Sequence, residues 1–173
     1  MALTPRGRAL RWLSTNRGAT ENPAGSNTDK GPIRAAQIRL GAGDKYLVGQ
    51  PWCGTWAGNA LMAGGVKNVD GRIAGVAWIE DQARARKAPF RGWTSDSRQV
   101  LRGDLVVLFG YGIHVGVVRN CRWAVRKLGY IVTDEGNTSS GNSGSQDNGG
   151  GSYRRLRKLT DVHGYALVDY PDK

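Results

Sequence analysis

Three separated segments carry side chains that could act together as a thiol nucleophile and its base. Cys53 follows a proline and a tryptophan at the start of a predicted helix. The positive end of the helix dipole and the open backbone N–H groups there favour a thiolate, which is the reactive form of cysteine. His114 lies in a valine-rich predicted strand, and Glu135 and Asn137 lie where the next strand region ends. This set is typical of nucleophilic catalysis by a Cys–His pair.

The choice of base is narrow, because the chain has only two histidines. A period of two places His114, Gly116 and Val118 on one face of the predicted strand. The glycines near His114 allow another group to approach closely. The alternative base, His163, is predicted to be a surface residue beside a turn near the end of the chain.

Two side chains are candidates for orienting His114. Glu135 and Asn137 could each accept a hydrogen bond from the ring N–H that does not face the thiol. The ordinary alternative is that Asn137 is a turn residue and Glu135 a solvated carboxylate. Asp134 is predicted to point to the opposite face from Glu135.

The two cysteines, Cys53 and Cys121, are too few for a disulfide framework. If Cys53 is a nucleophile it is free, and Cys121 is then a core or edge residue; a disulfide between the two stays open. The sequence contains no CxxC, HExxH or clustered His/Cys set. We therefore expect no metal site and no cofactor.

The predicted elements favour an α+β fold in one domain, residues 1–173, with helices first and then an antiparallel sheet of about six strands. Proline at the first helical position marks the helix starts at Pro5 and Pro32, the former capped by Thr4. Helices are expected at 5–18, 32–40, from 53 to the glycines at 64–65, and at 75–86. Strands are expected at 105–109, 113–119, 122–126, 130–135, 153–159 and 165–170, with a Gly/Ser/Asn-rich loop over 136–152.

The charge is strongly positive, with 25 Lys and Arg against 14 Asp and Glu and a formal net charge of +11. Such a field favours an anionic partner, either nucleic acid or the anionic polymers of a bacterial wall. The basic run at 154–158 is predicted to form one exposed strand face. No apolar run approaches the length of a membrane span, and the basic N-terminal segment does not read as a secretory signal. We therefore expect synthesis in the cytoplasm and no transmembrane segment.

Four segments together resemble the CHAP family of cysteine, histidine-dependent amidohydrolases/peptidases. They are Gln-Pro-Trp-Cys-Gly at 50–54, Gly-Asp-Leu-Val at 103–106, His-Val-Gly-Val-Val at 114–118 and Glu-Gly-Asn at 135–137. The family cleaves peptidoglycan and is common in bacteriophage endolysins and virion-associated wall hydrolases. The resemblance covers the chain from about residue 20 to its end.

The resemblance implies a papain-like fold with Cys53 as nucleophile and His114 as general base and acid. Glu135 would orient His114, with Asn137 as an additional orienting or polar group. Gln50 would support the oxyanion hole together with the N–H of Cys53. Beside the nucleophile, Trp52 is expected to line the substrate groove and Trp56 to lie in the core.

The implied function is hydrolysis of an amide bond of peptidoglycan, by an N-acetylmuramoyl-L-alanine amidase or a peptide endopeptidase. We expect a monomer acting on the bacterial wall, either as a phage-encoded lysin or on a virion. Calcium is not expected, because the loop at 41–46 holds one acid and a lysine. The alternatives are a non-catalytic wall-binding or tail structural module, and a nucleic-acid binder. The last is suggested by charge alone, because no RNP-like, zinc-finger or helix-turn-helix pattern is present.

Overall fold

Four α helices and a six-stranded antiparallel sheet form the part of the chain that the structure describes. The structure is a computed structural model, and it describes residues 2–122, 126–141 and 144–172. The helices are α1 (Pro5–Thr15), α2 (Pro32–Leu40), α3 (Cys53–Ala63) and α4 (Val76–Arg84). The strands are β1 (Phe90–Thr94), β2 (Leu105–Leu108), β3 (His114–Asn120), β4 (Tyr130–Thr138), β5 (Gly151–Lys158) and β6 (Val162–Val168). The predicted α+β class is confirmed.

The helix starts follow the local signals in the sequence. Pro5 and Pro32 each lie in the first turn of a helix. The Thr4 hydroxyl accepts a hydrogen bond from the backbone N–H of Gly7 at 3.1 Å, which is the predicted N-cap. In the part of the chain that the structure describes, no helix combines the length and apolar character needed to cross a membrane.

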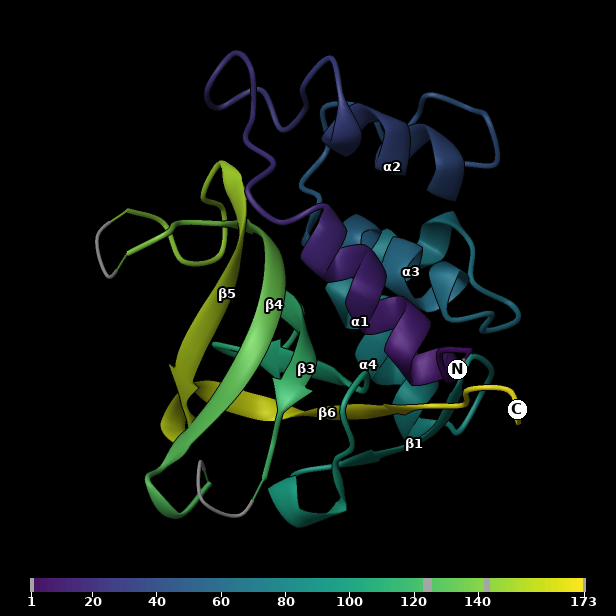
Figure 1. Cartoon of the computed structure of the whole chain (residues 1–173), viewed down its shortest axis with the longest axis vertical. Coiled ribbons are helices and arrows are strands. Elements are labelled where there is room, and N and C mark those ends of the chain that lie inside the picture. The colour runs from purple at the N-terminus through teal and green to yellow at the C-terminus, as the bar shows by residue number, and fades with distance from the viewer. Residues whose placement is uncertain (1, 123–125, 142–143, 173) are drawn as a thin grey trace.

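The strands lie in the order β1-β6-β2-β3-β4-β5, and all neighbours are antiparallel. The helices gather on one side of the sheet, with α3 and α4 packed against its strands and α1 and α2 packed on α3 (Figure 1). In the same view β4 and β5 stand steeply across β1 and β6, so the sheet twists along its width (Figure 1). The strand β3, which begins at His114, lies near the middle of the sheet, between β2 and β4.

Both faces of the central strands are buried, which explains their continuous valine-rich sequence. Val107, Val115 and Val117 belong to the larger core beneath the helices. Val106 and Val118 belong to a second, smaller core on the other face. The alternation therefore separates two apolar cores rather than a core from solvent.

The membership of the sheet differs from the prediction in two places. The edge strand β1 is not among the predicted strands; its sequence Phe-Arg-Gly-Trp-Thr has a glycine in its middle, and it pairs with β6 through a bulge. The strand predicted at 122–126 falls mainly on residues 123–125, which lie outside the described residues, while Arg126 is helical. β4 also extends to Thr138, so the predicted loop starts later than expected.

Neighbouring acids on β4 point to opposite faces, as predicted. Asp134 is buried on the helix side, where Arg119 and Arg154 both bind its carboxylate. The Arg119 guanidinium also donates to the backbone carbonyl of Leu10 in α1 at 2.9 Å. Asp134 therefore helps to hold α1 on the sheet and is not available to His114.

A buried carboxylate joins the two ends of the chain. Asp104 is fully buried and accepts hydrogen bonds from the backbone N–H groups of Leu101 at 2.8 Å and Val168 at 3.1 Å. Arg6 in α1 binds the same carboxylate at 2.9 Å. This places the first helix beside the last strand, and both termini lie close together in Figure 1.

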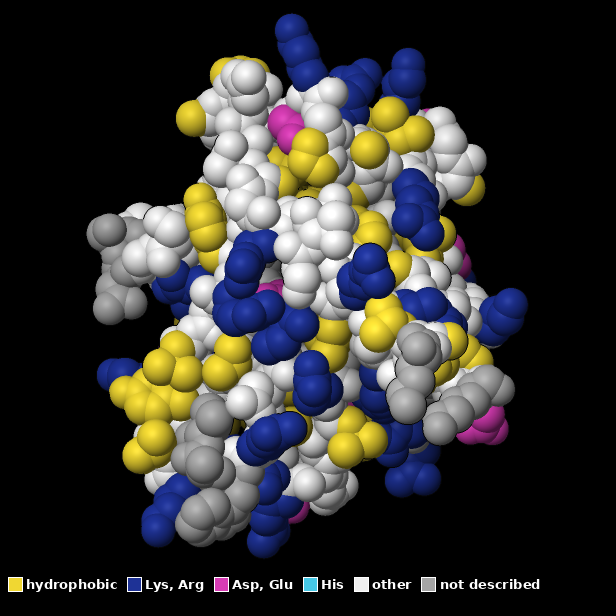
Figure 2. All heavy atoms as spheres, viewed as in Figure 1, with side chains coloured by type: hydrophobic (Ala, Val, Ile, Leu, Met, Phe, Trp, Pro, Cys, Tyr) yellow, Lys and Arg dark blue, Asp and Glu magenta, His cyan; other side chains and the backbone are white. Residues whose placement is uncertain are grey.

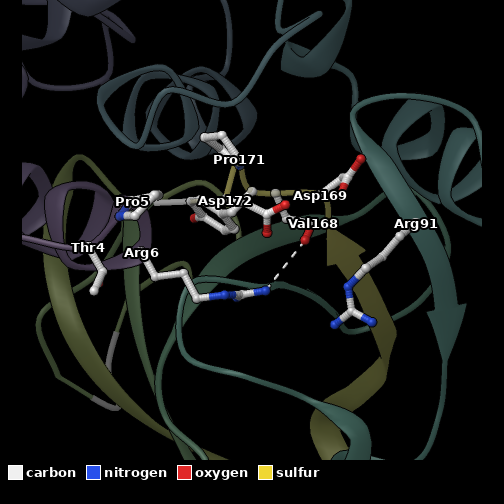
Figure 3. Close-up of a pocket in the computed structure, with 9 residues that line it drawn as sticks. Thr4, Pro5, Arg6, Arg91, Val168, Asp169, Pro171 and Asp172 are labelled. Carbon is white, nitrogen blue, oxygen red and sulfur yellow. Dashed lines mark hydrogen bonds between the residues drawn. The ribbon is translucent and has the colours of Figure 1, made fainter.

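A pocket of about 420 Å³ lies beside this ion pair, between the start of α1 and the end of β6. Figure 3 shows Arg6 and Arg91 reaching into the same space from different elements. The Arg91 guanidinium is 3.9 Å from Asp104 and is partly exposed. No cysteine or histidine lines this pocket, so it is separate from the predicted nucleophile.

We predict that Asp104→Ala lowers the free energy of unfolding by about 3 kcal/mol, because it removes the counter-charge of Arg6 and the acceptor of the Leu101 and Val168 N–H groups. Urea denaturation measures the change. The control Arg98→Ala breaks an ion pair whose arginine is 81% exposed, and should leave the urea midpoint unchanged. Equal midpoints for the two variants would show that Asp104 does not hold the termini.

Candidate active site

Cys53 is the first residue of α3, as the sequence predicts. Trp52 precedes it as the N-cap residue and contributes no side-chain hydrogen bond, so the N–H groups of the first turn have no capping side chain. Cys53 is 5% exposed, and its thiol is free. Cys53, the candidate nucleophile, therefore lies at the positive end of a helix in a water-poor environment.

His114 is the first residue of β3 and is completely buried. Its Nε2 atom lies 3.0 Å from Oε2 of Glu135. The ring also interacts with the Cys53 thiol. Nδ1 has no hydrogen-bond partner among the described residues, and because Nε2 faces Glu135, Nδ1 is the ring nitrogen left to face the thiol. The structure thus brings three of the predicted site residues together in the order thiol, imidazole, carboxylate.

Two glycines allow this convergence. Gly116 pairs with Glu135 across β3 and β4, and a Cβ at Gly116 would lie 2.7 Å from the Cγ of Glu135. A Cβ at Gly136 would lie 2.7 Å from both Trp52 and Trp56, at the start of α3. The first glycine leaves room for the carboxylate beside His114, as predicted from the sequence. The second lets the Cys53 helix pack directly on β4.

The thiol and the imidazole shift each other's pKa in opposite directions. Burial raises the pKa of Cys53, but interaction with His114 and with the backbone N–H groups of Val115 and Gly54 outweighs burial and lowers it. Burial likewise opposes charge on His114, but its interactions with Cys53 and Glu135 raise its pKa to about 10. Both shifts favour a thiolate–imidazolium pair over the neutral thiol and imidazole.

Glu135 is ionised and is bound on all sides. Burial raises its pKa, but Arg157 and His114 overcome burial and lower the pKa to about 2. Arg157 donates to both carboxylate oxygens, from Nε at 2.8 Å and from Nη2 at 2.5 Å. The Thr133 hydroxyl lies 2.5 Å from Oε1. Glu135 is therefore the residue that orients His114, which resolves the choice left open by the sequence.

Arg157 was missed as a site residue, because the run 154–158 was predicted to form an exposed basic face. That prediction is wrong for Arg155 and Arg157, which are 8% and 5% exposed, while Arg154, Leu156 and Lys158 are exposed. The two arginines point to the same face of the sheet as Thr133, which is paired with Arg155. The signal was their spacing of two, which places both on one strand face.

Asn137 does not contact His114. Its side-chain Nδ2 donates to Oδ1 of Asn148 at 3.0 Å, and its own Oδ1 is buried without a partner. Asn137 has a φ of +58°, at an irregularity in the pairing of β4 with β5 that follows Glu135. Among the described residues Asn137 makes no hydrogen bond to His114, so Glu135 and not Asn137 occupies the orienting position.

Gln50 is exposed in the segment that leads into α3. Its backbone carbonyl accepts a hydrogen bond from Nε2 of the buried Gln37 at 3.3 Å. The same Nε2 donates to the carbonyl of Asn27 at 2.8 Å, and the Thr28 hydroxyl donates to the Gln37 amide oxygen at 3.0 Å. Gln37, which was not predicted to be a site residue, therefore anchors the backbone that carries Gln50.

Trp52 does not line an open groove, contrary to prediction. It is completely buried, and its ring packs edge-on against Trp56 with ring centroids 5.2 Å apart. Its indole N–H donates to Oε1 of Glu21 at 2.9 Å. The large apolar ring is covered by the Glu21 loop and by β4, so Trp52 supports the start of α3 instead. Trp56 lies in the core, as predicted.

The second histidine and the second cysteine lie apart from this cluster. His163 is exposed, as predicted, and its Nε2 is 3.1 Å from the buried carboxylate of Glu80. Cys121 is free and half-buried, and its thiol donates to the carbonyl of Val100 at 3.0 Å. Burial raises the pKa of Cys121, so the two thiols differ in reactivity.

No family model, curated protein or solved structure matches this chain. Among residues 2–122, 126–141 and 144–172, no three His, Cys, Asp or Glu side chains gather as metal ligands would. The site itself offers a buried thiol, an imidazole that can accept and return a proton, and a carboxylate that holds the ring.

We predict that the ultraviolet absorbance of the Cys53 thiolate is present at neutral pH, where an ordinary thiol is mostly protonated. The difference spectrum between wild type and Cys53→Ala isolates it from Cys121. In His114→Ala the same absorbance should appear only at alkaline pH, because the counter-ion is gone. Identical titration curves for wild type and His114→Ala would rule out the ion pair.

We predict that Glu135 contributes stability in one pH range only. Its pKa falls from 4.5 to about 2 on folding, so the contribution is complete above 4.5 and is lost as the pH falls toward 2. The unfolding free energy of Glu135→Gln should be lower than that of wild type by on the order of 3 kcal/mol at neutral pH. Chemical denaturation at several pH values measures the gap, and a gap that does not shrink in acid contradicts the assignment.

Proposed function

We propose that this protein is a cysteine-dependent hydrolase of the CHAP type that cleaves an amide bond in bacterial peptidoglycan. The observation that carries the proposal is the buried chain of contacts from Cys53 through His114 to Glu135. A helix that begins at the nucleophile and packs on an antiparallel sheet that carries the base also supports a papain-like fold. The whole chain, 1–173, would then be one CHAP-like catalytic domain.

In the first half-reaction the Cys53 thiolate attacks the carbonyl carbon of the scissile amide. The C–S bond forms, and the negative charge moves to the carbonyl oxygen. The backbone N–H of Cys53, at the start of α3, is the proposed oxyanion donor, with Gln50 as a second donor on the anchored backbone before it. In comparable sites one such donor lowers the activation barrier by roughly 3 kcal/mol.

His114 then completes both half-reactions. The imidazolium gives its proton to the leaving amine, and the C–N bond breaks to leave a thioester on Cys53. The neutral imidazole accepts a proton from water as that water attacks the thioester, which releases the acid and restores the thiolate–imidazolium pair. Glu135 stays ionised throughout and keeps the ring aligned.

The surface charge supports an anionic wall as the target. Figure 2 shows basic side chains spread over one face of the molecule with few acidic ones among them, in keeping with the net charge of +11. Such a surface would concentrate the enzyme on anionic polymers. In this proposal the protein is a monomeric phage lysin, or a virion-associated enzyme, made in the cytoplasm and acting on the wall.

One observation favours a second candidate, a wall-binding or tail structural module without catalysis. Cys53 is 5% exposed and His114 is completely buried, so the thiol and the ring are covered in this structure. A module that had kept the fold and lost its reaction would need no path to the thiol. Catalysis requires that the covering segments open for substrate.

We predict that wild-type protein releases defined fragments from purified peptidoglycan and that Cys53→Ala releases them at least about a thousandfold more slowly. Mass spectrometry of the digest measures release, and the new termini identify the bond. The matched control is Cys121→Ala, which removes a thiol outside the site and should keep wild-type activity.

The same digest separates the two candidates. If wild type releases nothing while both wild type and Cys53→Ala sediment with the wall, the binding module is correct. If Cys53→Ala still lyses the wall, Cys53 is not the nucleophile and the proposed mechanism is wrong.

A further inference from the structure

A second pocket lies on the side of the sheet away from the helices, next to the catalytic cluster. Its volume is about 490 Å³, and Phe109, Tyr130, Arg155, Arg157 and Lys158 are among the residues that line it. Two of these five residues are the buried arginines of β5. The mechanism above gives this pocket no role.

Among the residues that the structure describes, Arg155 is a buried cation that forms no ion pair with a carboxylate. It is 8% exposed, and its Nη2 donates to two neutral oxygens, the carbonyl of Gly141 at 2.8 Å and Oε1 of Gln146 at 2.7 Å. Its Nε is buried and has no hydrogen-bond partner in the part of the chain that the structure describes. A buried guanidinium with an unused donor is costly for a protein to keep.

The neighbouring arginine does not share this property. Arg157 is neutralised by Glu135, which accepts hydrogen bonds from two of its nitrogens. The remaining charges at the pocket are Arg155, Lys158 and one acid, Asp161. The pocket therefore keeps an excess of positive charge, to which Arg155 contributes from within its wall.

The pocket is connected to His114 through the ring of Phe109 and the guanidinium of Arg157. The ring of Phe109, which lines the pocket, lies 6.2 Å from the ring of His114. The Arg157 guanidinium lies 5.2 Å above the ring of Phe109 and binds the carboxylate that orients His114. A group bound in the pocket would therefore lie one side chain away from the catalytic ring.

We infer that this pocket binds a carboxylate of the substrate peptide and that Arg155 is the residue that recognises it. The inference rests on the proposed function for the identity of the substrate. A carboxylate would supply the missing counter-charge, and guanidinium groups bind planar carboxylates through paired N–H donors. Phosphate shares this chemistry, so the two anions must be separated by experiment.

The test measures equilibrium binding to the full-length Cys53→Ala protein, so it does not depend on hydrolysis. The probes are N-acetylglycine, its uncharged amide, and inorganic phosphate, each followed by the NMR shifts of backbone amides around the pocket. We expect N-acetylglycine to bind about tenfold more tightly than the amide. In the double variant that carries Cys53→Ala and Arg155→Gln, N-acetylglycine and its amide should bind equally.

Two further variants keep the result interpretable. Lys87→Gln removes the same positive charge from an exposed loop and should keep the full preference for the carboxylate. Arg155→Lys retains the charge without the paired donors and should keep part of the preference. If Arg155→Gln does not fold, the partial loss in Arg155→Lys carries the test.

Equal binding of acid and amide, or a preference that both Arg155 variants leave unchanged, would overturn the inference. Phosphate binding more tightly than N-acetylglycine would assign the pocket to a phosphate group and overturn the carboxylate assignment. Failure of the proposed function would look different: the wild type would leave peptidoglycan intact while the Arg155-dependent preference persisted.

Discussion

The site depends on a carboxylate that is kept ionised inside the protein. Glu135 is 1% exposed, where an unpaired charge would be neutralised, so its negative charge requires the guanidinium of Arg157. The same charge supports the imidazolium of His114, and the imidazolium in turn supports the Cys53 thiolate. Two cations and two anions thus balance one another, and removing His114 or Glu135 removes an interaction that favours the charged form of its neighbour.

The scaffold around this balance serves mainly to bring three elements into contact. β3 supplies His114, β4 supplies Glu135, and the N-terminus of α3 supplies Cys53. The register of β3 with β4 sets His114 beside Glu135. Because Gly116 has no side chain, the Glu135 carboxylate can approach β3, and because Gly136 has none, α3 can approach β4. Small changes in these contacts would move the reacting groups apart, because densely packed interiors transmit displacement instead of absorbing it.

The alternation of β4 assigns two adjacent acids to two tasks. Asp134 faces the helices and, through Arg119, holds α1 on the sheet. Glu135 faces the other side and holds the ring of His114. The arginines of β5 divide in the same way, with Arg154 binding Asp134 and Arg157 binding Glu135. One face of the β4–β5 pair thus holds α1 on the sheet, and the opposite face carries the candidate site. The carboxylates of β4 explain why its neighbour β5 is so basic.

From the sequence by itself one could predict where the helices start, where most strands lie, and that Cys53, His114 and Glu135 belong to one candidate site. Prolines, caps and hydrophobic periods act within a few residues, so they can be read without knowing the fold. Tertiary structure decided the rest: the edge strand β1, the burial of Trp52, and the choice of Glu135 over Asn137 as the partner of His114. It also decided the burial of Arg155 and Arg157, which were predicted to be exposed. These features depend on strand register and on contacts between residues distant in sequence, because an isolated basic run does not reveal which carboxylate lies opposite it.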